Sequence, residues 1–116
     1  MMNRREIGVA GEEQVAEYLR ADGWEILARN YRSAGKEIDI VARRGGVVAF
    51  VEVKKRNQER WGKGAEAVDF RKRRRIARTA ARYLAENALV DVNARFDVAS
   101  IDGGSLDYIE NAFQAD

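Results

Sequence analysis

The sequence predicts a single α/β domain over residues 1–116, in which helices pack against a small mixed β-sheet. A chain of 116 residues can form one modest core but not two independent ones. The hydrophobic fraction of 46% and the charged fraction of 34% are typical of a folded globular protein. Hydrophobic patterns with helical and strand-like spacing follow one another in the order helix, three strands, helix, strand, strand.

The first half of the chain predicts one helix and three strands. Apolar and small residues recur at helical spacing over residues 4–21, and Asp22-Gly23 is typical of a helix end. Gly45-Gly46 predicts a tight hairpin turn, because both central residues of a type I′ turn need positive φ. The residues that mark the buried side of the helix are Ile7, Gly11, Val15, Tyr18 and Leu19. The predicted strands are 24–31, 37–43 and 47–54, with a turn over 32–36.

The second half predicts one helix and two strands. Residues 55–67 have two glycines around Trp61 and little periodicity, so they predict a loop. Asp69 is a suitable N-cap for a helix over 70–87. The buried side of this helix is expected to consist of Ile76, Ala80, Tyr83 and Leu84. The last two predicted strands are 95–101 and a short one over 106–109, joined by a turn.

Two residue types are absent, and their absence excludes several classes of site. With no cysteine, the chain has no disulfide, thiolate metal site or cysteine nucleophile. With no histidine, it has no Ser-His-Asp triad, histidine base or histidine metal ligand. Any metal ion must therefore be a hard cation with oxygen ligands, for which Mg²⁺ or Mn²⁺ is expected. Targeting signals and apolar stretches of about 20 residues are also absent, so we expect a cytoplasmic protein.

Charge is strongly segregated along the chain. Residues 1–53 carry 8 basic and 9 acidic groups, residues 54–82 carry 12 and 3, and residues 83–116 carry 1 and 7. Arginine matches phosphate oxygens with its planar fork, so the basic segment predicts contacts with nucleic-acid phosphates. A solvated helix face paired with the acidic C-terminal segment is an equal alternative. The candidate phosphate-binding residues are Arg56, Arg60, Lys63, Arg71, Arg73, Arg74 and Arg75.

The hairpin around Gly45-Gly46 brings charged side chains together. A two-residue loop places Asp39 opposite Glu52, and Glu37 opposite Lys54. Side chains alternate along a strand, so these four charged residues are expected on one face of the sheet. The other face is expected to carry Ile38, Ile40, Val51 and Val53.

The facing carboxylates of Asp39 and Glu52 predict a metal site. Two carboxylates opposite each other in a sheet repel, and a divalent cation between them would offset this repulsion. Lys54 would lie beside the ion, where it could orient a water molecule or neutralise charge developing on a phosphate. The alternative is an ordinary cross-strand ion pair between Glu37 and Lys54, with Asp39 solvated. We favour the metal site, because the lysine is in register and hydrophobic residues flank it on both strands.

Several short motifs resemble those of a known nuclease superfamily. Glu37-Ile38-Asp39 followed by Phe50-Val51-Glu52-Val53-Lys54 looks like the PD-(D/E)XK signature. Over nearly its whole length the chain resembles the YraN-like family of small bacterial proteins, which is itself similar to archaeal Holliday junction resolvases. The further matching motifs are Gly11-Glu12, Arg29-Asn30-Tyr31-Arg32, Arg74-Arg75-Ile76, Tyr83-Leu84 and Arg95-Phe96-Asp97-Val98.

The resemblance implies a restriction-endonuclease-like core and assigns roles to matching positions. Asp39 and Glu52 would be metal ligands, and Lys54 would be the catalytic lysine. Glu12 would be a more distant acidic member of the site, similar to the first-helix glutamate of the resolvases; the alternative is an exposed glutamate on the helix surface. Glu37 would be an auxiliary acid. Lys36 departs from the family pattern, in which glycine is usual, and this puts the turn before the strand in doubt.

These features lead to one functional hypothesis and two alternatives. We expect a Mg²⁺- or Mn²⁺-dependent endonuclease that hydrolyses phosphodiester bonds in DNA, including branched DNA, and recognises it through backbone charge and shape. One alternative is a non-catalytic nucleic-acid-binding module that retains the nuclease fold. The other is an interaction protein whose basic helix binds an acidic partner. A symmetric homodimer is a further expectation, because a domain of 116 residues covers little of a branched substrate.

Overall fold

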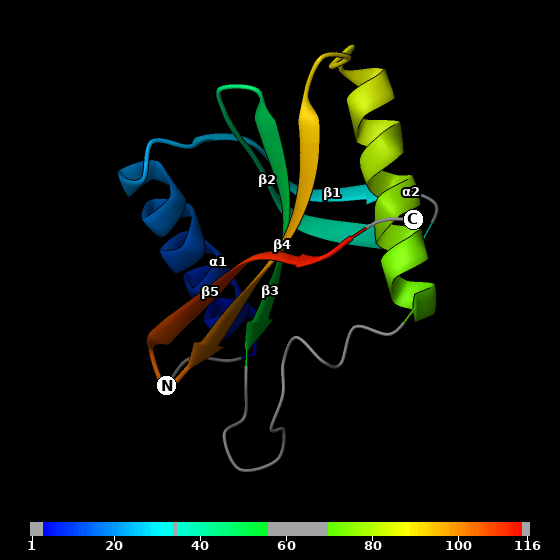
Figure 1. Ribbon diagram of the computed structural model, residues 1–116. Coiled ribbons are helices and arrows are strands. Elements are labelled where there is room, and N and C mark those ends of the chain that lie inside the picture. Colours follow the sequence, from blue (N-terminus) through cyan, green and yellow to red (C-terminus); the bar gives the residue numbers. More distant parts are fainter. Residues whose placement is uncertain (1–3, 34, 56–69, 115–116) are drawn as a thin grey trace.

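The computed structural model describes residues 4–33, 35–55 and 70–114, and its elements follow the predicted order (Figure 1). A five-stranded mixed sheet and two helices form an α/β fold. The helices are α1 (Arg4–Ala21) and α2 (Phe70–Glu86). The strands are β1 (Glu25–Ser33), β2 (Lys36–Arg44), β3 (Val47–Lys55), β4 (Asn93–Asp102) and β5 (Ser105–Phe113). Neither described helix is long and apolar enough to span a membrane.

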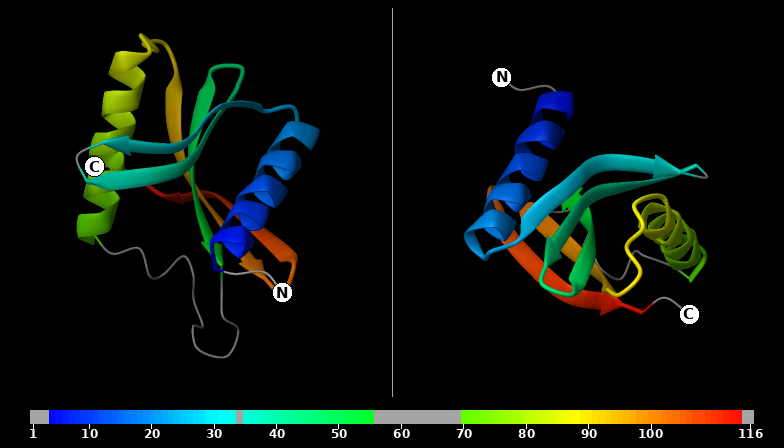
Figure 2. Two further views of the ribbon diagram at one scale, coloured as in Figure 1. Left: turned by 180° about the vertical axis from the view of Figure 1, so that it is seen from behind. Right: turned by 90° about the horizontal axis from the view of Figure 1, so that it is seen from above.

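The strands of the described sheet lie in sequence order. β1, β2 and β3 pair in antiparallel fashion, and β4 and β5 form a second antiparallel pair. β3 and β4 are parallel. Parallel strands need a crossover connection, and α2 lies between these two strands in the chain. α2 therefore packs on one face of the sheet, while α1 packs on the other (Figure 2).

Two hydrophobic clusters, one on each face, hold the helices to the sheet. On one face, Val15 and Leu19 of α1 pack with Val51 of β3. On the other face, the rings of Tyr83 in α2 and Phe50 in β3 meet edge to face, with centroids 6.1 Å apart. Neighbouring residues of β3 thus point into opposite clusters, as the two-residue period of a strand requires. Because both faces of β3 are covered, its sequence is a nearly continuous hydrophobic run.

Some predicted boundaries of the strands differ from the structure. The turn predicted over 32–36 is shorter, because β1 continues to Ser33, which pairs with Lys36 at the start of β2. The last strand is not short: it extends to Phe113, which pairs with Phe96 beyond a register shift. The shift coincides with a positive φ of 52° at Asn111, as is typical of a bulge. The polar residues around the bulge resemble a strand end in sequence, which explains the early predicted stop.

Three further expectations need correction. Gly45 has the positive φ expected at the hairpin turn, 60°, but Gly46 does not, which is the pattern of a type II′ rather than a type I′ turn. Tyr18, expected on the buried side of α1, is 44% exposed, and its ring packs at the rim of the cluster against Tyr108. Of the predicted loop over 55–67, Lys55 is the last residue of β3, and residues 56–67 lie outside the described residues.

Candidate metal centre and basic helix

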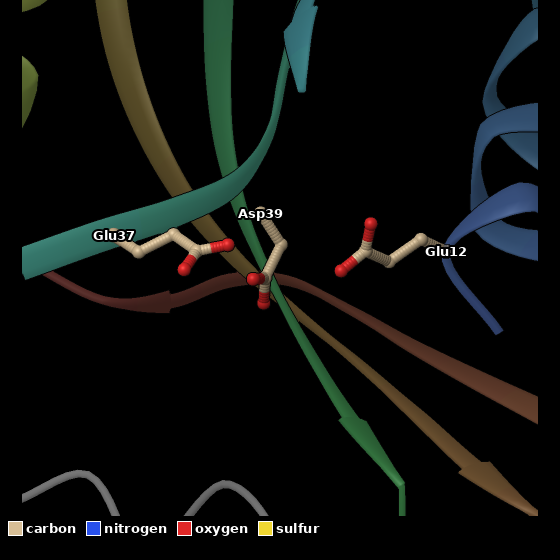
Figure 3. A group of neighbouring side chains, drawn as sticks. All are labelled: Glu12, Glu37 and Asp39. Atoms are coloured by element: carbon tan, nitrogen blue, oxygen red, sulfur yellow. The ribbon is translucent and has the colours of Figure 1, made fainter. Parts of the chain in front are cut away.

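β2 and β3 separate where the charged residues lie. Their ladder has the predicted register, and its last backbone pair is Ile40–Val51. Beyond this pair β2 bends (Figure 3), and Asp39 Oδ2 accepts a hydrogen bond from the Val53 N–H at 2.7 Å. The predicted backbone pair of Asp39 with Glu52 is therefore not formed. A side-chain carboxylate takes the place of a backbone acceptor at this point of the hairpin.

The predicted division of the hairpin into a charged and an apolar face is wrong for β2. Ile40 packs in the cluster below α1, whereas Ile38 packs in the cluster below α2. The bend at Asp39 lies between these two residues, and strict alternation of side chains holds only along a regular strand. In β3, alternation holds, because Val51 and Val53 both pack in the α1 cluster.

Three carboxylates from two elements converge at the bend (Figure 3). Glu12 comes from α1, and Glu37 and Asp39 come from β2; one oxygen of each lies within 4.8 Å of the others. All three residues are partly buried. Close approach of α1 to the sheet positions Glu12, because a side chain at Gly11 would meet the Ile101 methyl group at 3.3 Å. The structure thus brings together three of the predicted acidic residues.

The surroundings of Asp39 strongly oppose the ionisation of its carboxylate. Burial raises the pKa of Asp39 to about 6, and the surrounding carboxylates add to the effect, although the hydrogen bond from the backbone opposes it. Arginines lie beside the other two acids: Arg29 Nη2 is 3.9 Å from Glu12, and Arg32 Nη2 is 3.1 Å from Glu37. The described hydrogen-bond donor to Asp39 is a backbone N–H, not a cationic side chain. A divalent cation would supply positive charge at this position.

Glu52 points toward the α2 face of β3 and is held by two lysines. Lys72 Nζ lies 2.8 Å from Glu52 Oε2, and Lys54 Nζ lies 3.6 Å from the same oxygen. Burial alone would raise the pKa of Glu52, but the lysines, Lys72 first, lower it below its ordinary value. Burial alone would lower the pKa of Lys72, but the contact with Glu52 raises it above its ordinary value. Burial lowers the pKa of Lys54; Glu52 opposes this effect and the charge of Lys72 adds to it.

Lys72 is a residue of the site that sequence reasoning missed. The basic run over 71–75 looks uniform in the sequence. Lys72, however, precedes Ile76 by four residues, and Ile76 and Tyr83 are buried against the sheet. Residues four apart share one face of a helix, so Lys72 lies on the side of α2 that faces β3. The helical period, anchored on Ile76, would have distinguished this lysine from its neighbours.

The arginines of α2 contact aromatic rings and border a hollow, and Arg74 does both. The Arg73 guanidinium lies 5.5 Å from the centre of the Phe113 ring, and that of Arg74 lies 5.4 Å from the centre of the Phe70 ring. An arginine-lined hollow of about 240 Å³ is bordered by Arg71, Arg74, Arg75 and Arg78. The other predicted phosphate-binding residues, Arg56, Arg60 and Lys63, lie outside the described residues.

The carboxylates at the bend suit Mg²⁺ or Mn²⁺, but they differ from the predicted ligand set. Glu12, Glu37 and Asp39 offer hard oxygen donors close enough to share one ion. Glu37, expected only as an auxiliary acid, belongs to this group. Glu52, expected as a ligand beside Asp39, stands outside it and contacts the two lysines instead.

Comparison with known proteins identifies the family of the chain. Residues 11–101, which extend from α1 to β4, match the family described as "Uncharacterised protein family UPF0102". A UPF0102 protein of Symbiobacterium thermophilum is 45% identical over 119 residues, which cover 98% of this chain and 100% of the relative. A UPF0102 protein of Myxococcus xanthus is 41% identical, over 97% of this chain and 92% of the relative. One of Geobacter sulfurreducens is 42% identical, over 93% and 88% respectively. The chain therefore belongs to the UPF0102 family of bacterial proteins, in agreement with the YraN-like resemblance.

Proposed function

We propose that this chain is a nuclease of the PD-(D/E)XK type that requires a divalent cation and hydrolyses phosphodiester bonds, with DNA as the preferred substrate. The observation that carries the proposal is the convergence of Glu12, Glu37 and Asp39 at the bend of β2. The adjacent strand β3 carries Glu52 and Lys54, whose charged atoms are 3.6 Å apart. Carboxylates that face one another in a partly buried place are costly, and such clusters are typical of functional sites. The split hairpin beside a parallel strand pair supports a restriction-endonuclease-like core.

Each group of residues has its own part in the proposed reaction. Glu12, Glu37 and Asp39 would hold Mg²⁺ or Mn²⁺, which supplies positive charge to stabilise the negative charge that develops on the phosphodiester. The Lys54 ammonium lies 3.6 Å from Glu52 Oε2, and in the proposed reaction it orients the attacking water or stabilises charge on the phosphate. Because histidine is absent, no imidazole competes with Lys54 for a general acid–base role.

The arginines of α2 support the proposal that nucleic acid binds next to the carboxylates. Four exposed arginines follow at spacings of four, three and four, so they form one stripe along the helix: Arg71, Arg75, Arg78 and Arg82. A helix of 17 residues is about 25 Å long, enough to follow several successive phosphates. Phosphate contacts of this kind set affinity and orientation without reading sequence. The proposed nuclease is therefore selective for nucleic-acid shape rather than for a base sequence.

A cleavage assay on labelled duplex, single-stranded and branched DNA, with Mg²⁺ or Mn²⁺, tests the proposal. The parent chain should cleave at least one of these substrates, and Lys54→Met should lower the rate by about 100-fold or more. Lys55→Met is the matched control, because Lys55 is the next residue of β3 and has an exposed side chain. It should retain the parent rate. DNA binding measured with EDTA should be nearly unchanged in both variants.

Two results would contradict the nuclease. If the parent chain binds these DNAs but cleaves none of them with either metal, the non-catalytic binding module is the better description. If Lys54→Met cleaves at the parent rate, the catalytic centre lies elsewhere.

A further inference from the structure

The ion pair of Glu52 with Lys72 connects the candidate metal centre to the basic helix. Glu52 lies in β3, two residues before Lys54, and Lys72 lies in the first turn of α2. The side chains are 16% and 31% exposed, and their charged atoms are 2.8 Å apart. A charge-assisted hydrogen bond in such a partly buried position is stronger than one at the open surface.

Glu52 lies outside the carboxylate group and pairs with two lysines. Lys72 and Lys54 approach the same oxygen, Oε2, at 2.8 and 3.6 Å. The carboxylates whose oxygens lie within 4.8 Å of one another do not include Glu52. A metal ion that used Glu52 as a ligand would lie close to the ammonium group of Lys72, which contacts the same carboxylate. The two positive charges would repel each other. The ion and Lys72 therefore compete for one carboxylate.

The surroundings of Lys72 favour phosphate as its alternative partner. The first turn of α2 contains no acidic residue, and Arg71 and Arg75 lie next to Lys72 on the exposed side. The N-terminal end of a helix also carries partial positive charge, which attracts anions. Glu52 supplies negative charge here, and a phosphate of a nucleic acid lying along the arginines would supply it as well. The long, flexible stem of lysine allows its ammonium group to move between two such partners.

We propose that Lys72 exchanges between Glu52 and a substrate phosphate, so that metal binding at Glu52 depends on nucleic-acid binding. This inference rests on the proposed nuclease function and adds a positioning residue to it. Without nucleic acid, Lys72 pairs with Glu52 and lowers the affinity of the site for the metal ion. With nucleic acid bound, Lys72 contacts phosphate, and Glu52 becomes available beside Asp39. The complete ligand set then forms only when a substrate is present.

Lys72→Met tests the first half of this exchange, because methionine removes the charge and keeps an unbranched side chain. Titration calorimetry of the full chain with Mn²⁺ should show about tenfold tighter binding than in the parent, the effect of one charge-assisted hydrogen bond. Arg78→Met is the matched control, because it removes one positive charge from the outer surface of the same helix. Its Mn²⁺ affinity should stay within about twofold of the parent, since distant exposed charges are screened.

DNA binding provides the second readout. Ca²⁺ takes oxygen ligands of the same kind as Mg²⁺ and Mn²⁺, and its effect on the affinity for a labelled duplex can be measured by fluorescence anisotropy. Ca²⁺ should tighten duplex binding by the parent more than by Lys72→Met. The factor by which Ca²⁺ tightens duplex binding should be about tenfold larger in the parent than in Lys72→Met. This ratio equals the expected gain in ion affinity, because coupling between two ligands is reciprocal.

The outcomes separate this inference from the proposed function. Unchanged or weaker Mn²⁺ binding by Lys72→Met, with Mn²⁺ binding retained in the parent, would overturn the exchange and leave the nuclease proposal standing. Equal Ca²⁺ effects in the two chains would also overturn it. If neither chain binds Mn²⁺, the metal centre itself is refuted, and the exchange with it.

Discussion

Asp97 and Asp39 are both largely removed from solvent, yet their surroundings are opposite. Asp97 on β4 is 1% exposed, and its carboxylate accepts hydrogen bonds from the Arg95 guanidinium, from the Tyr108 hydroxyl at 2.6 Å and from the Asn111 N–H at 2.8 Å. Asp39 accepts its described hydrogen bond from one backbone N–H, and the carboxylates of Glu12, Glu52 and Glu37 raise its pKa. One aspartate is surrounded by donors and the other by like charges.

This difference distinguishes a structural carboxylate from a functional one. Donors satisfy the oxygens of Asp97, which binds β4 to the bulge of β5 and holds Arg95 against the Trp24 ring, 4.9 Å from its centre. Burial and the contact with Asp97 raise the pKa of Tyr108, so its hydroxyl remains a donor. Arg29 and Arg32 contact Glu12 and Glu37, whereas the described hydrogen bond to Asp39 comes from an uncharged backbone N–H, and the surrounding carboxylates raise its pKa. Charge alone therefore does not identify the site; the partners of each charge do.

The largest expected effect on stability is at Asp97. Asp97→Asn removes the buried charged partner of Arg95, which then keeps, of its described ion pairs, only that with the exposed Glu110. The substitution should lower the free energy of unfolding by about 3–5 kcal/mol, as for other broken buried ion pairs. Asp39→Asn removes repulsion and should leave the free energy of unfolding at neutral pH unchanged or higher. Urea unfolding with EDTA measures both. Losses of similar size in the two variants would remove the distinction between these aspartates.

A smaller effect concerns the pH dependence of stability. The pKa of Asp39 in the folded chain is about 6, above its ordinary value of 3.8, so the folded state binds this proton more tightly than the unfolded state. The resulting stabilisation is complete below about pH 4 and is lost as the pH rises through about 6. Without metal, the stability of Asp39→Asn relative to the parent should therefore increase by about 2–3 kcal/mol from pH 4 to pH 8.

Asp107→Asn is the control for this measurement, because Asp107 is an exposed aspartate of β5 outside the carboxylate group. Its stability relative to the parent should change little with pH. The free energies of unfolding of Asp39→Asn and the parent could instead differ by a constant amount over this pH range. That result would show that the pKa of Asp39 is not raised in the folded chain.

Local patterns in the sequence were sufficient to predict the order of the elements and the register of the central hairpin. Gly45-Gly46 sets that register, which holds as far as the Ile40–Val51 pair. Glu37 and Asp39 are predicted to lie near each other because they are two residues apart in one strand. The resemblance to a nuclease family added Glu12, whose helical position alone is equally compatible with an exposed glutamate.

Features that depend on packing between elements were not predictable in this way. The bend of β2 at Asp39 places Ile38 and Ile40 in different clusters, and no local pattern marks it. The contact between Glu52 and Lys72 joins residues from a strand and a helix that are separated by residues 56–69 in the chain. The position of the helix on the sheet determines which cation of its basic run reaches the carboxylate.

The most direct test of the metal centre is its affinity for Mn²⁺, measured by titration calorimetry on the parent and on Asp39→Asn. Asp39 lies between Glu12 and Glu37 in the carboxylate group (Figure 3). Its loss should weaken Mn²⁺ binding more than about tenfold, a loss of affinity that is typical when a residue of a metal site is replaced. Asp107→Asn should bind as the parent does. Equal Mn²⁺ affinity of the parent and a folded Asp39→Asn chain would contradict a metal centre at this bend.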